Sequence, residues 1–225
     1  MKISCIIPCY NEEGRVGQVL DVALSAKFVN EIVVVDNAST DNTVAEIKQR
    51  KDNRIKLIIH KQNLGKGSSV KDGFNNSTGD VVFILDSDLK NLTIENIRNL
   101  VTPITNGDYD LVLSDRTEPF SSFAGAWFIT GEKSFRRKEW REFFKGYQER
   151  GYSIEQRINE YALNNKMKIG VVRWPNVVAI SKMSKDGFFP GFVRDIKMYQ
   201  NLCGDFGYIN FASQWWKIRK MAKRI

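Results

Sequence analysis

Two aspartates, Asp86 and Asp88, directly follow a run of five apolar residues at positions 81–85. Such a run is typical of a buried strand in a parallel sheet, and the carboxyl ends of parallel strands line the ligand crevice of open α/β sheets. Two carboxylates placed there repel each other unless a cation lies between them. Oxygen ligands at this spacing suit Mg²⁺ or Mn²⁺, with a diphosphate completing the octahedron. We therefore predict a divalent cation at Asp86 and Asp88.

Apolar runs alternate with helical periodicity over the first 115 residues. The pattern predicts strands at 3–8, 31–36, 55–60, 81–85 and 109–114, and helices at 13–24, 39–50, 65–76 and 93–105. Short loops between them indicate a Rossmann-like α/β fold with a mostly parallel central sheet flanked by helices. After Asp115 the pattern changes, and it predicts helices at 133–150 and 153–165 and a strand at 169–174.

Polar residues follow three of the predicted strands, and we expect them to meet at one edge of the sheet. Asp36, at the end of the second strand, either accepts hydrogen bonds from a nucleotide base or serves as a helix cap or turn former. Lys66, between two glycines, is either a cation brought close to a diphosphate or a solvated lysine in a turn. The chain has no Gly-x-Gly-x-x-Gly motif after its first strand and no P-loop, which disfavours dinucleotide-binding proteins and P-loop NTPases.

Four segments, at 6–13 (IIPCYNEE), 33–43 (VVVDNASTDNT), 63–67 (NLGKG) and 85–89 (LDSDL), resemble the family 2 glycosyltransferases of GT-A fold. The resemblance implies a UDP- or GDP-sugar as donor and Mg²⁺ or Mn²⁺ as cofactor. By motif position it implies that Asp36 contacts the base, that Lys66 lies near the nucleotide, and that Asp86 and Asp88 bind the metal. The predicted donor-binding residues are Pro8, Tyr10, Asn11, Glu12, Asp36, Asn37, Lys66, Asp86, Ser87 and Arg116.

Two positions depart from this family. Asn37 stands where the family often has a second acid, and positions 177–182 lack the histidine that joins the metal shell in many relatives. Coordination by Asp88, diphosphate and water is therefore the simpler model. The chain's one histidine, His60, follows the third predicted strand, and we expect a structural role for it.

The acceptor hydroxyl must lose a proton unless the acceptor is already an anion, so a base is useful. We predict Glu155 as base or acceptor-orienting residue, with Glu132 second. Their segments resemble acceptor-side segments of the family members that build polyprenyl-phosphate sugars or small phosphorylated glycosides. Glu155 could instead complement a helix N-terminus. Asp115 and Arg116 are further candidates near the sugar. The basic residues Lys182, Lys185 and Arg194, around the loop at 187–191, either gather phosphate or form a solvated face.

The chain has 225 residues, a net charge of +8 and no apolar run near the ~18 residues that a membrane span needs. Its N-terminal segment is too short in apolar content for a signal peptide. Three cysteines without metal spacing fit a reducing cytosol. We therefore predict a cytoplasmic location, or a peripheral one at the inner face of the membrane.

The last residues form a predicted basic helix. Its apolar face consists of Phe211, Trp215, Ile218, Ala222 and Ile225, and its five basic residues are Lys217, Arg219, Lys220, Lys223 and Arg224. Such a helix could lie on an anionic membrane, where each basic residue contributes roughly 1 kcal/mol. Alternatively, it packs on its own domain or on a partner subunit.

These observations predict a nucleotide-sugar-binding half at 1–115, an acceptor-side half of the same domain at 116–209 and the C-terminal helix at 210–225. Our first hypothesis is a metal-dependent inverting glycosyltransferase acting on a lipid phosphate or a membrane-associated glycan. A second is transfer to a modified nucleic-acid base such as hydroxymethylated DNA, because basic residues are frequent at 136–145. A third is a non-catalytic sugar-nucleotide-binding partner subunit. The sequence indicates no oligomeric state.

Overall fold

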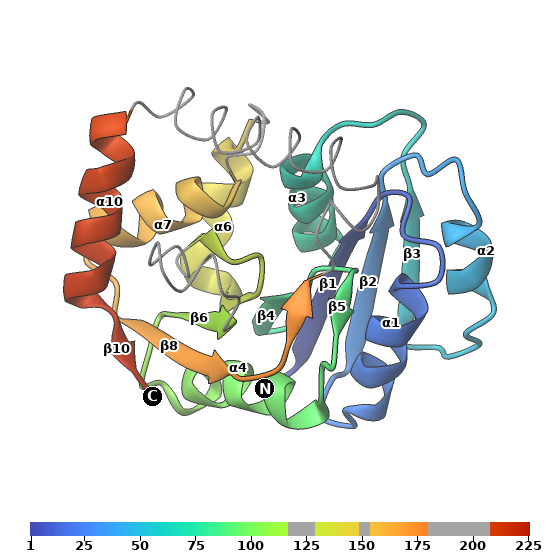
Figure 1. Ribbon diagram of the computed structural model, residues 1–225, viewed down its shortest axis with the longest axis horizontal. Helices are drawn as coiled ribbons and strands as arrows, with labels where there is room; N and C mark the ends of the chain where they lie inside the picture. The colour runs from blue at the N-terminus through green and yellow to red at the C-terminus, as the bar shows by residue number, and fades with distance from the viewer. Residues whose placement is uncertain (117–128, 149–153, 180–207) are drawn as a thin grey trace.

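A computed structural model describes residues 1–116, 129–148, 154–179 and 208–225 (Figure 1). The predicted alternation of strands and helices is confirmed in the first 116 residues, with bounds that shift by up to four residues. The strands are β1 (Ile3–Cys9), β2 (Glu31–Asp36), β3 (Ile55–Ile59), β4 (Val81–Ile84) and β6 (Leu111–Arg116). The helices are α1 (Val16–Ser25), α2 (Thr43–Lys48), α3 (Lys66–Asn76) and α4 (Ile94–Asn106).

The central sheet has eight strands in the order β10-β8-β6-β7-β4-β1-β2-β3, with β8 at Ile169–Trp174 and β10 at Lys223–Arg224. All its pairings are parallel except those of β7 (Lys133–Arg136), which runs antiparallel between β4 and β6. The prediction of a mostly parallel sheet is therefore confirmed.

The prediction of a helix from residue 133 is wrong at its start. Lys133, Ser134 and Phe135 are buried in β7, and helix α6 begins only at Arg137 and ends at Gly146. A lysine and a serine at buried strand positions hide the apolar run by which a central strand is normally recognised.

Helices cover both faces of the sheet (Figure 1). Apolar residues of α1, α2 and α4 pack on one face, and those of α3, α6 and α7 (Ile154–Asn164) pack on the other. Strand β4 serves both sides, because Phe83 belongs to the first cluster and Val82 and Ile84 belong to the second. Burial of both faces explains why the strands read as continuous apolar runs.

A small second sheet ties the chain after β4 to the chain after β8. It pairs β5 (Leu89–Lys90) antiparallel with β9 (Val178–Ala179). Asp88 immediately precedes β5, so this sheet fixes the path of the backbone beside it. Helix α4 follows, with a capping box between Thr93 and Asn96 at its start and Gly107, whose φ of 91° is left-handed, as its C-cap.

The C-terminal segment packs on its own domain. Helix α10 (Tyr208–Met221) ends before the predicted limit, and Lys223–Arg224 form the edge strand β10 beside β8. Ile218 is fully buried and Ala222 packs against the core, so these two residues of the predicted membrane-binding face are turned to the protein. Trp216, by contrast, is 58% exposed. Among the described residues, no helix has the length and apolar character needed to cross a bilayer.

Candidate functional site

The carboxyl ends of β4, β1 and β2 lie side by side, as predicted. Cys9 is paired with Asp36, and Ile6 is paired with Ile84, two residues before Asp86. The residues after these strands therefore share one edge of the sheet. The carboxyl end of β6 and the start of the antiparallel strand β7 lie at the same edge, because Lys133 is paired with both Ile84 and Leu113.

The loops after β1 and β2, residues 10–15 and 37–43, are bonded to each other, and we call them the loop pair. The Asn11 N–H donates to Ser39 Oγ at 2.9 Å, and the Thr40 N–H donates to Asn11 Oδ1 at 2.8 Å. The Glu12 N–H donates to Thr43 Oγ1 at 2.7 Å. Asn11 has a φ of 54°, a left-handed conformation that asparagine tolerates better than most residues.

Several predicted donor-binding residues thus have contacts inside the loop pair. Besides Asn11, the Glu12 carboxylate lies 2.5 Å from Arg15 Nε. Tyr10 is different, because 44% of it is exposed at the edge of the sheet. Pro8 lies inside β1, opposite Val35, and does not end that strand. Nucleotide contact by these residues stays a prediction.

Asp36 is fully buried, and its Oδ2 accepts the Ser39 N–H at 3.1 Å. This hydrogen bond is a contact of the kind that a turn-forming aspartate makes. The contact of Asp36 with a base stays a prediction.

Asn37 connects β2 to the loop that leads into α3. Its Nδ2 donates to Asn63 Oδ1 at 2.8 Å, and its Oδ1 accepts the Leu64 N–H at 2.9 Å. The ring of His60 lies 3.0 Å from Asn37 Oδ1 through one nitrogen and 3.0 Å from Asp72 Oδ2 through the other. These contacts give His60 a structural role, as expected. They also give a local reason for an amide at position 37, which both donates and accepts.

Lys66, the first residue of α3, joins two carboxylates that are distant in sequence. Its Nζ lies 2.6 Å from Asp86 Oδ1 and 2.8 Å from Glu155 Oε1 in the first turn of α7. Burial would lower the pKa of Lys66, but the carboxylates of Asp86 and Glu155 outweigh it and raise that pKa above its usual value. The structure therefore brings together Lys66, Asp86 and Glu155, three residues singled out from sequence.

Asp86 has further cations nearby. Burial would raise the pKa of Asp86, but Lys66, Arg116 and Lys133 lower it below its usual value. Gly131 lies against this carboxylate so closely that a Cβ at position 131 would overlap Asp86. The absence of a side chain at position 131 thus provides the space in which Asp86 meets Lys66.

Lys133 and Gly131 belong to the site but were not predicted. Lys133 is fully buried, and its pKa falls to about 8 because burial outweighs the attraction of Glu155 and Glu132. A lysine buried in a central strand would have indicated a functional site. The sequence did not reveal it, because residue 133 was expected to begin a helix. Gly131 has no sequence signal, because its importance comes from Asp86, 45 positions earlier in the chain.

Glu132 and Arg116 form the other side of the same group of charges. Glu132 is fully buried, and its Oε1 lies 3.4 Å from Arg116 Nη1. Its Oε2 accepts hydrogen bonds from the hydroxyl of Ser114, at 2.8 Å, and from the hydroxyl of Thr130. We define the charged cluster as Lys66, Lys133, Arg116, Asp86, Glu132 and Glu155. It contains three cations and three anions, which suits charges that are largely removed from water.

Asp115 has a different neighbour. Its Oδ2 lies 3.6 Å from Nη2 of Arg224 in the edge strand β10. Roles for Asp115 and Glu132 in the reaction stay predictions.

The metal prediction can be tested against the oxygen donors present. Asp86 is held by Lys66, whereas Asp88 is partly exposed and lies in the turn before β5, and Ser87 is buried between them. Within the described residues, no group of three or more acidic, histidine or cysteine side chains could enclose a metal ion. Mg²⁺ is commonly held by one or two carboxylates together with substrate phosphates, so Asp88 with a diphosphate fits such an ion.

Some predicted phosphate-binding residues lie outside the described part of the chain. They are Lys182, Lys185 and Arg194, with the loop at 187–191.

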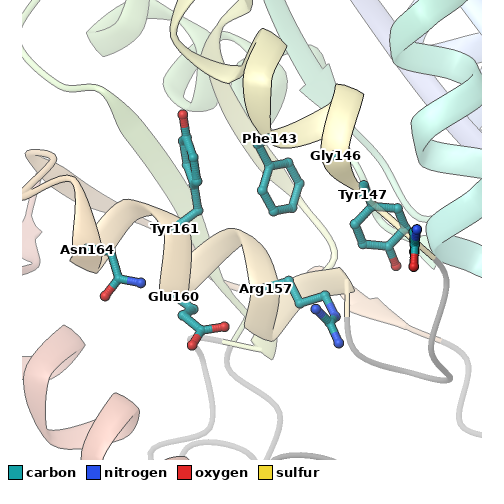
Figure 2. A pocket seen from close by; sticks show the side chains of 8 residues that line it. Phe143, Gly146, Tyr147, Arg157, Glu160, Tyr161 and Asn164 are labelled. Atoms are coloured by element: carbon teal, nitrogen blue, oxygen red, sulfur yellow. The ribbon is translucent and has the colours of Figure 1, made fainter.

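A separate pocket of about 320 Å³ lies between α6 and α7 (Figure 2). It is lined mainly by aromatic and charged side chains, among them Phe143, Tyr147, Arg157, Glu160 and Tyr161. None of its lining residues belongs to the charged cluster or to the predicted donor site.

Sequence comparison finds several relatives that share one name. Over 118 residues the chain is 37% identical to undecaprenyl-phosphate 4-deoxy-4-formamido-L-arabinose transferase of Proteus mirabilis, and over 117 residues it is 35% identical to the protein of that name in Edwardsiella ictaluri. The first match covers 49% of this chain and 36% of the relative. The chain thus matches about a third of the length of these relatives.

Solved structures share the fold. Glucosyl-3-phosphoglycerate synthase from Mycobacterium tuberculosis, in complex with Mn²⁺, UDP and phosphoglyceric acid, matches with a TM-score of 0.68 and 21% identity. The match covers 90% of this chain and 78% of that one. The same enzyme with Mg²⁺ and UDP matches with a TM-score of 0.67, 21% identity and coverage of 90% and 79%. The expected GT-A fold is thereby confirmed.

The family model for glycosyl transferase family 2 matches residues 4–171. The chain therefore belongs to the family 2 glycosyltransferases.

Proposed function

We propose that this protein is a metal-dependent, inverting glycosyltransferase that moves a sugar from a UDP- or GDP-sugar to a lipid phosphate. The observation that carries the proposal is the position of Lys66, Asp86 and Asp88 at the carboxyl edge of the sheet in a chain of this family. A lipid-phosphate acceptor is supported by the name of the Proteus relative. A UDP-type donor and a divalent ion are supported by what the mycobacterial neighbour was crystallised with.

In this proposal, Asp88 holds the divalent ion together with the donor diphosphate. When bound, the ion stabilises the charge that develops on the departing diphosphate. Lys66 supplies a second positive charge on the same side, and the ion pair with Asp86 keeps its ammonium at the edge of the sheet. In this proposal Tyr10 contacts the nucleoside, which is supported by its exposure and by its position directly after Cys9, the partner of Asp36.

A phosphate acceptor also explains why neither predicted base is available to accept a proton. An acceptor oxygen that is already negative needs no proton acceptor. Glu155, the first candidate for a base, lies in an ion pair with Lys66, and the second candidate, Glu132, is fully enclosed. Direct attack of the phosphate oxygen on the sugar carbon, opposite to the leaving diphosphate, gives inversion.

The test is sugar transfer from radiolabelled UDP- and GDP-sugars to a short polyprenyl phosphate, with and without Mg²⁺ or Mn²⁺. Asp88→Asn should reduce transfer by at least about 100-fold, since a charge-stabilising group is lost. Asp108→Asn is the matched control, because Asp108 is exposed and follows α4. Undiminished transfer by Asp88→Asn would contradict the proposed metal ligand. Absence of transfer with every donor would contradict the function itself.

We also propose that the tail contacts an anionic membrane surface, although not through the face first predicted. The exposed residues are Trp216 and its basic neighbours, with Lys220 Nζ 5.2 Å from the centre of the Trp216 ring. Trp at headgroup level and nearby basic residues favour such a surface. Co-sedimentation with phosphatidylglycerol vesicles, but not with phosphatidylcholine vesicles, should be lost in a Trp216→Ala, Lys220→Glu double variant. Equal binding of the variant would contradict this contact.

Neither alternative function gains support. In the basic segment, the Arg137 guanidinium donates to the carbonyls of Gly79 and Phe74 at 2.7 and 2.9 Å, and Arg136 donates to that of Ile104 at 3.0 Å. These two arginines serve internal contacts, so they do not form a free stripe for a nucleic-acid backbone. A non-catalytic subunit is tested by the transfer assay above. Cell fractionation would test the predicted cytoplasmic location, and light scattering would measure the oligomeric state.

A further inference from the structure

Lys66 has two carboxylate partners, and they come from opposite halves of the chain. Asp86 follows β4 in the first half, and Glu155 lies in the first turn of α7 in the second. The distances from Lys66 Nζ, 2.6 and 2.8 Å, are those of strong charge-assisted hydrogen bonds. Through these two ion pairs, Lys66 links the donor-side motif to a helix of the acceptor-side segment.

The ammonium group can still meet a third partner. It carries three N–H donors, and two point at these carboxylates. About a third of the Lys66 side chain, 35%, is exposed, whereas Asp86 and Glu155 are exposed by only 18% and 14%. The Lys66 side chain is therefore more open to solvent than either acid.

The two acids are not equally firmly placed. Lys133 attracts both acids, but Asp86 is also attracted by Arg116 and occupies the space left by Gly131. Moving Asp86 away from the cluster would cost all of these interactions. Glu155 lies on the first turn of a helix, on a longer side chain with more rotatable bonds, so its carboxylate can turn away without displacing the backbone.

We propose that Glu155 is an exchangeable counter-ion of Lys66, which the donor diphosphate displaces, and that it is therefore a positioning residue and not the proton acceptor. This inference rests on the proposed function. Before the donor binds, Glu155 completes the charge balance around the Lys66 ammonium group. When a diphosphate takes its place, Glu155 is released at the start of α7, so donor binding changes the acceptor side of the site.

The charge of Glu155 should then oppose diphosphate binding. Glu155→Gln removes this charge but keeps an oxygen that can accept from Lys66. We expect the variant to bind inorganic pyrophosphate, UDP and GDP about 5- to 20-fold more tightly, the size expected for one charge removed at short range. Its kcat should stay within about tenfold of that of the wild type. A general base would behave differently, because its loss lowers kcat by about 100- to 10,000-fold and leaves nucleotide affinity unchanged.

The experiment is titration calorimetry of wild type, Glu155→Gln, Glu155→Asp and Glu160→Gln with these three ligands, with and without Mg²⁺. Glu160 is the matched control, because it lies on the same helix but is exposed and has no part in the cluster. Glu160→Gln and the charge-retaining Glu155→Asp should bind like wild type. Circular dichroism melting of each variant verifies that it is folded.

Two failures can be told apart. If wild type binds the nucleotides and Glu155→Gln binds them no more tightly, the exchange of counter-ions is wrong while the proposed function stands. If wild type binds none of the three ligands, the proposed function fails and this inference fails with it. A kcat loss above 100-fold at unchanged affinity would restore Glu155 as the base.

Discussion

The loop pair and the charged cluster lie at the same edge of the sheet, but different contacts hold them. In the loop pair, side chains of Asn11, Ser39 and Thr43 bond to backbone groups of the neighbouring loop. In the charged cluster, Lys66, Asp86 and Glu155 pair with one another. Bonds between side chains and backbone groups fix one loop shape, whereas the paired side-chain charges of the cluster can change partners when another ion arrives. The loop pair is therefore built to keep its shape, and the cluster is built to respond to an anion.

The largest expected effect tests the space around Asp86. Gly131→Ala should reduce sugar transfer by about 100-fold, because its Cβ would displace the Asp86 carboxylate from Lys66. Gly146→Ala is the control, since a Cβ at position 146 meets no atom within 4 Å. Steady-state kinetics of both variants checks this. Equal rates would show that the position of Asp86 is not critical.

The second prediction concerns the amide of Asn37, which ties the loop pair to the chain before α3. Asn37→Ala removes the bonds to Asn63 and Leu64 and should lower the free energy of unfolding by about 2–3 kcal/mol. The exposed Asn53 is the control, and its replacement by alanine should change stability by less than about 0.5 kcal/mol. Urea denaturation measures both. A loss of transfer without a loss of stability would place Asn37 in the ligand site instead.

The third prediction uses Lys133 in the cluster. Its pKa of about 8 in the folded protein lies below the ordinary value of 10.5, so the unfolded chain binds more protons between these two values. The wild type should therefore gain stability relative to Lys133→Met as the pH rises from 7 to 9.5, by at most about 1.4 kcal/mol per pH unit. Urea denaturation at several pH values measures this difference. A difference that does not change with pH would mean that Lys133 keeps its ordinary pKa.

The smallest effect is expected in the loop pair, at the opposite end of the pH scale. Partial burial would raise the pKa of Asp41, but hydrogen bonds from Thr43 and from the Glu13 N–H lower it below 3.8. The stability that these bonds give is present above pH 3.8 and is lost as the pH falls below it. Relative to Asp41→Asn, wild type should lose less than about 1 kcal/mol between pH 5 and pH 3, because the group is screened by water. A larger loss would indicate that the loops depend on charge as strongly as the cluster does.

Sequence patterns were sufficient for the first half of the fold. Strands β1, β2, β3 and β4 are apolar runs that end near polar residues, and their periodicity identifies them without tertiary information. The resemblance to the family assigned Lys66 to the nucleotide and Asp86 to the metal, but it did not predict their ion pair. Glu155 was found only as a residue of an acceptor-side segment, and its contact with Lys66 depends on how α7 packs.

The parts that sequence did not predict depend on distant contacts. Lys133 lies in a strand because β4 and β6 bury it on both sides, and nothing local to 133–136 specifies this. Gly131 matters because of the carboxylate beside it. The tail was expected to present its apolar face to a membrane, but Ile218 and Ala222 pack on the core instead, because the domain offers that face a partner.

Strand β7 has a consequence for how the protein is made and divided. It inserts between β4 and β6, so the sheet gains continuity only when residues 133–136 are in place. During synthesis, β4 and β6 leave the ribosome before β7. Until β7 is made, the facing edges of β4 and β6 have no hydrogen-bonding partner between them. A fragment cut after β6 would therefore leave one edge of β4 and both edges of β6 unpaired, and it would tend to aggregate. Split versions of this enzyme would need their breakpoint downstream of β7.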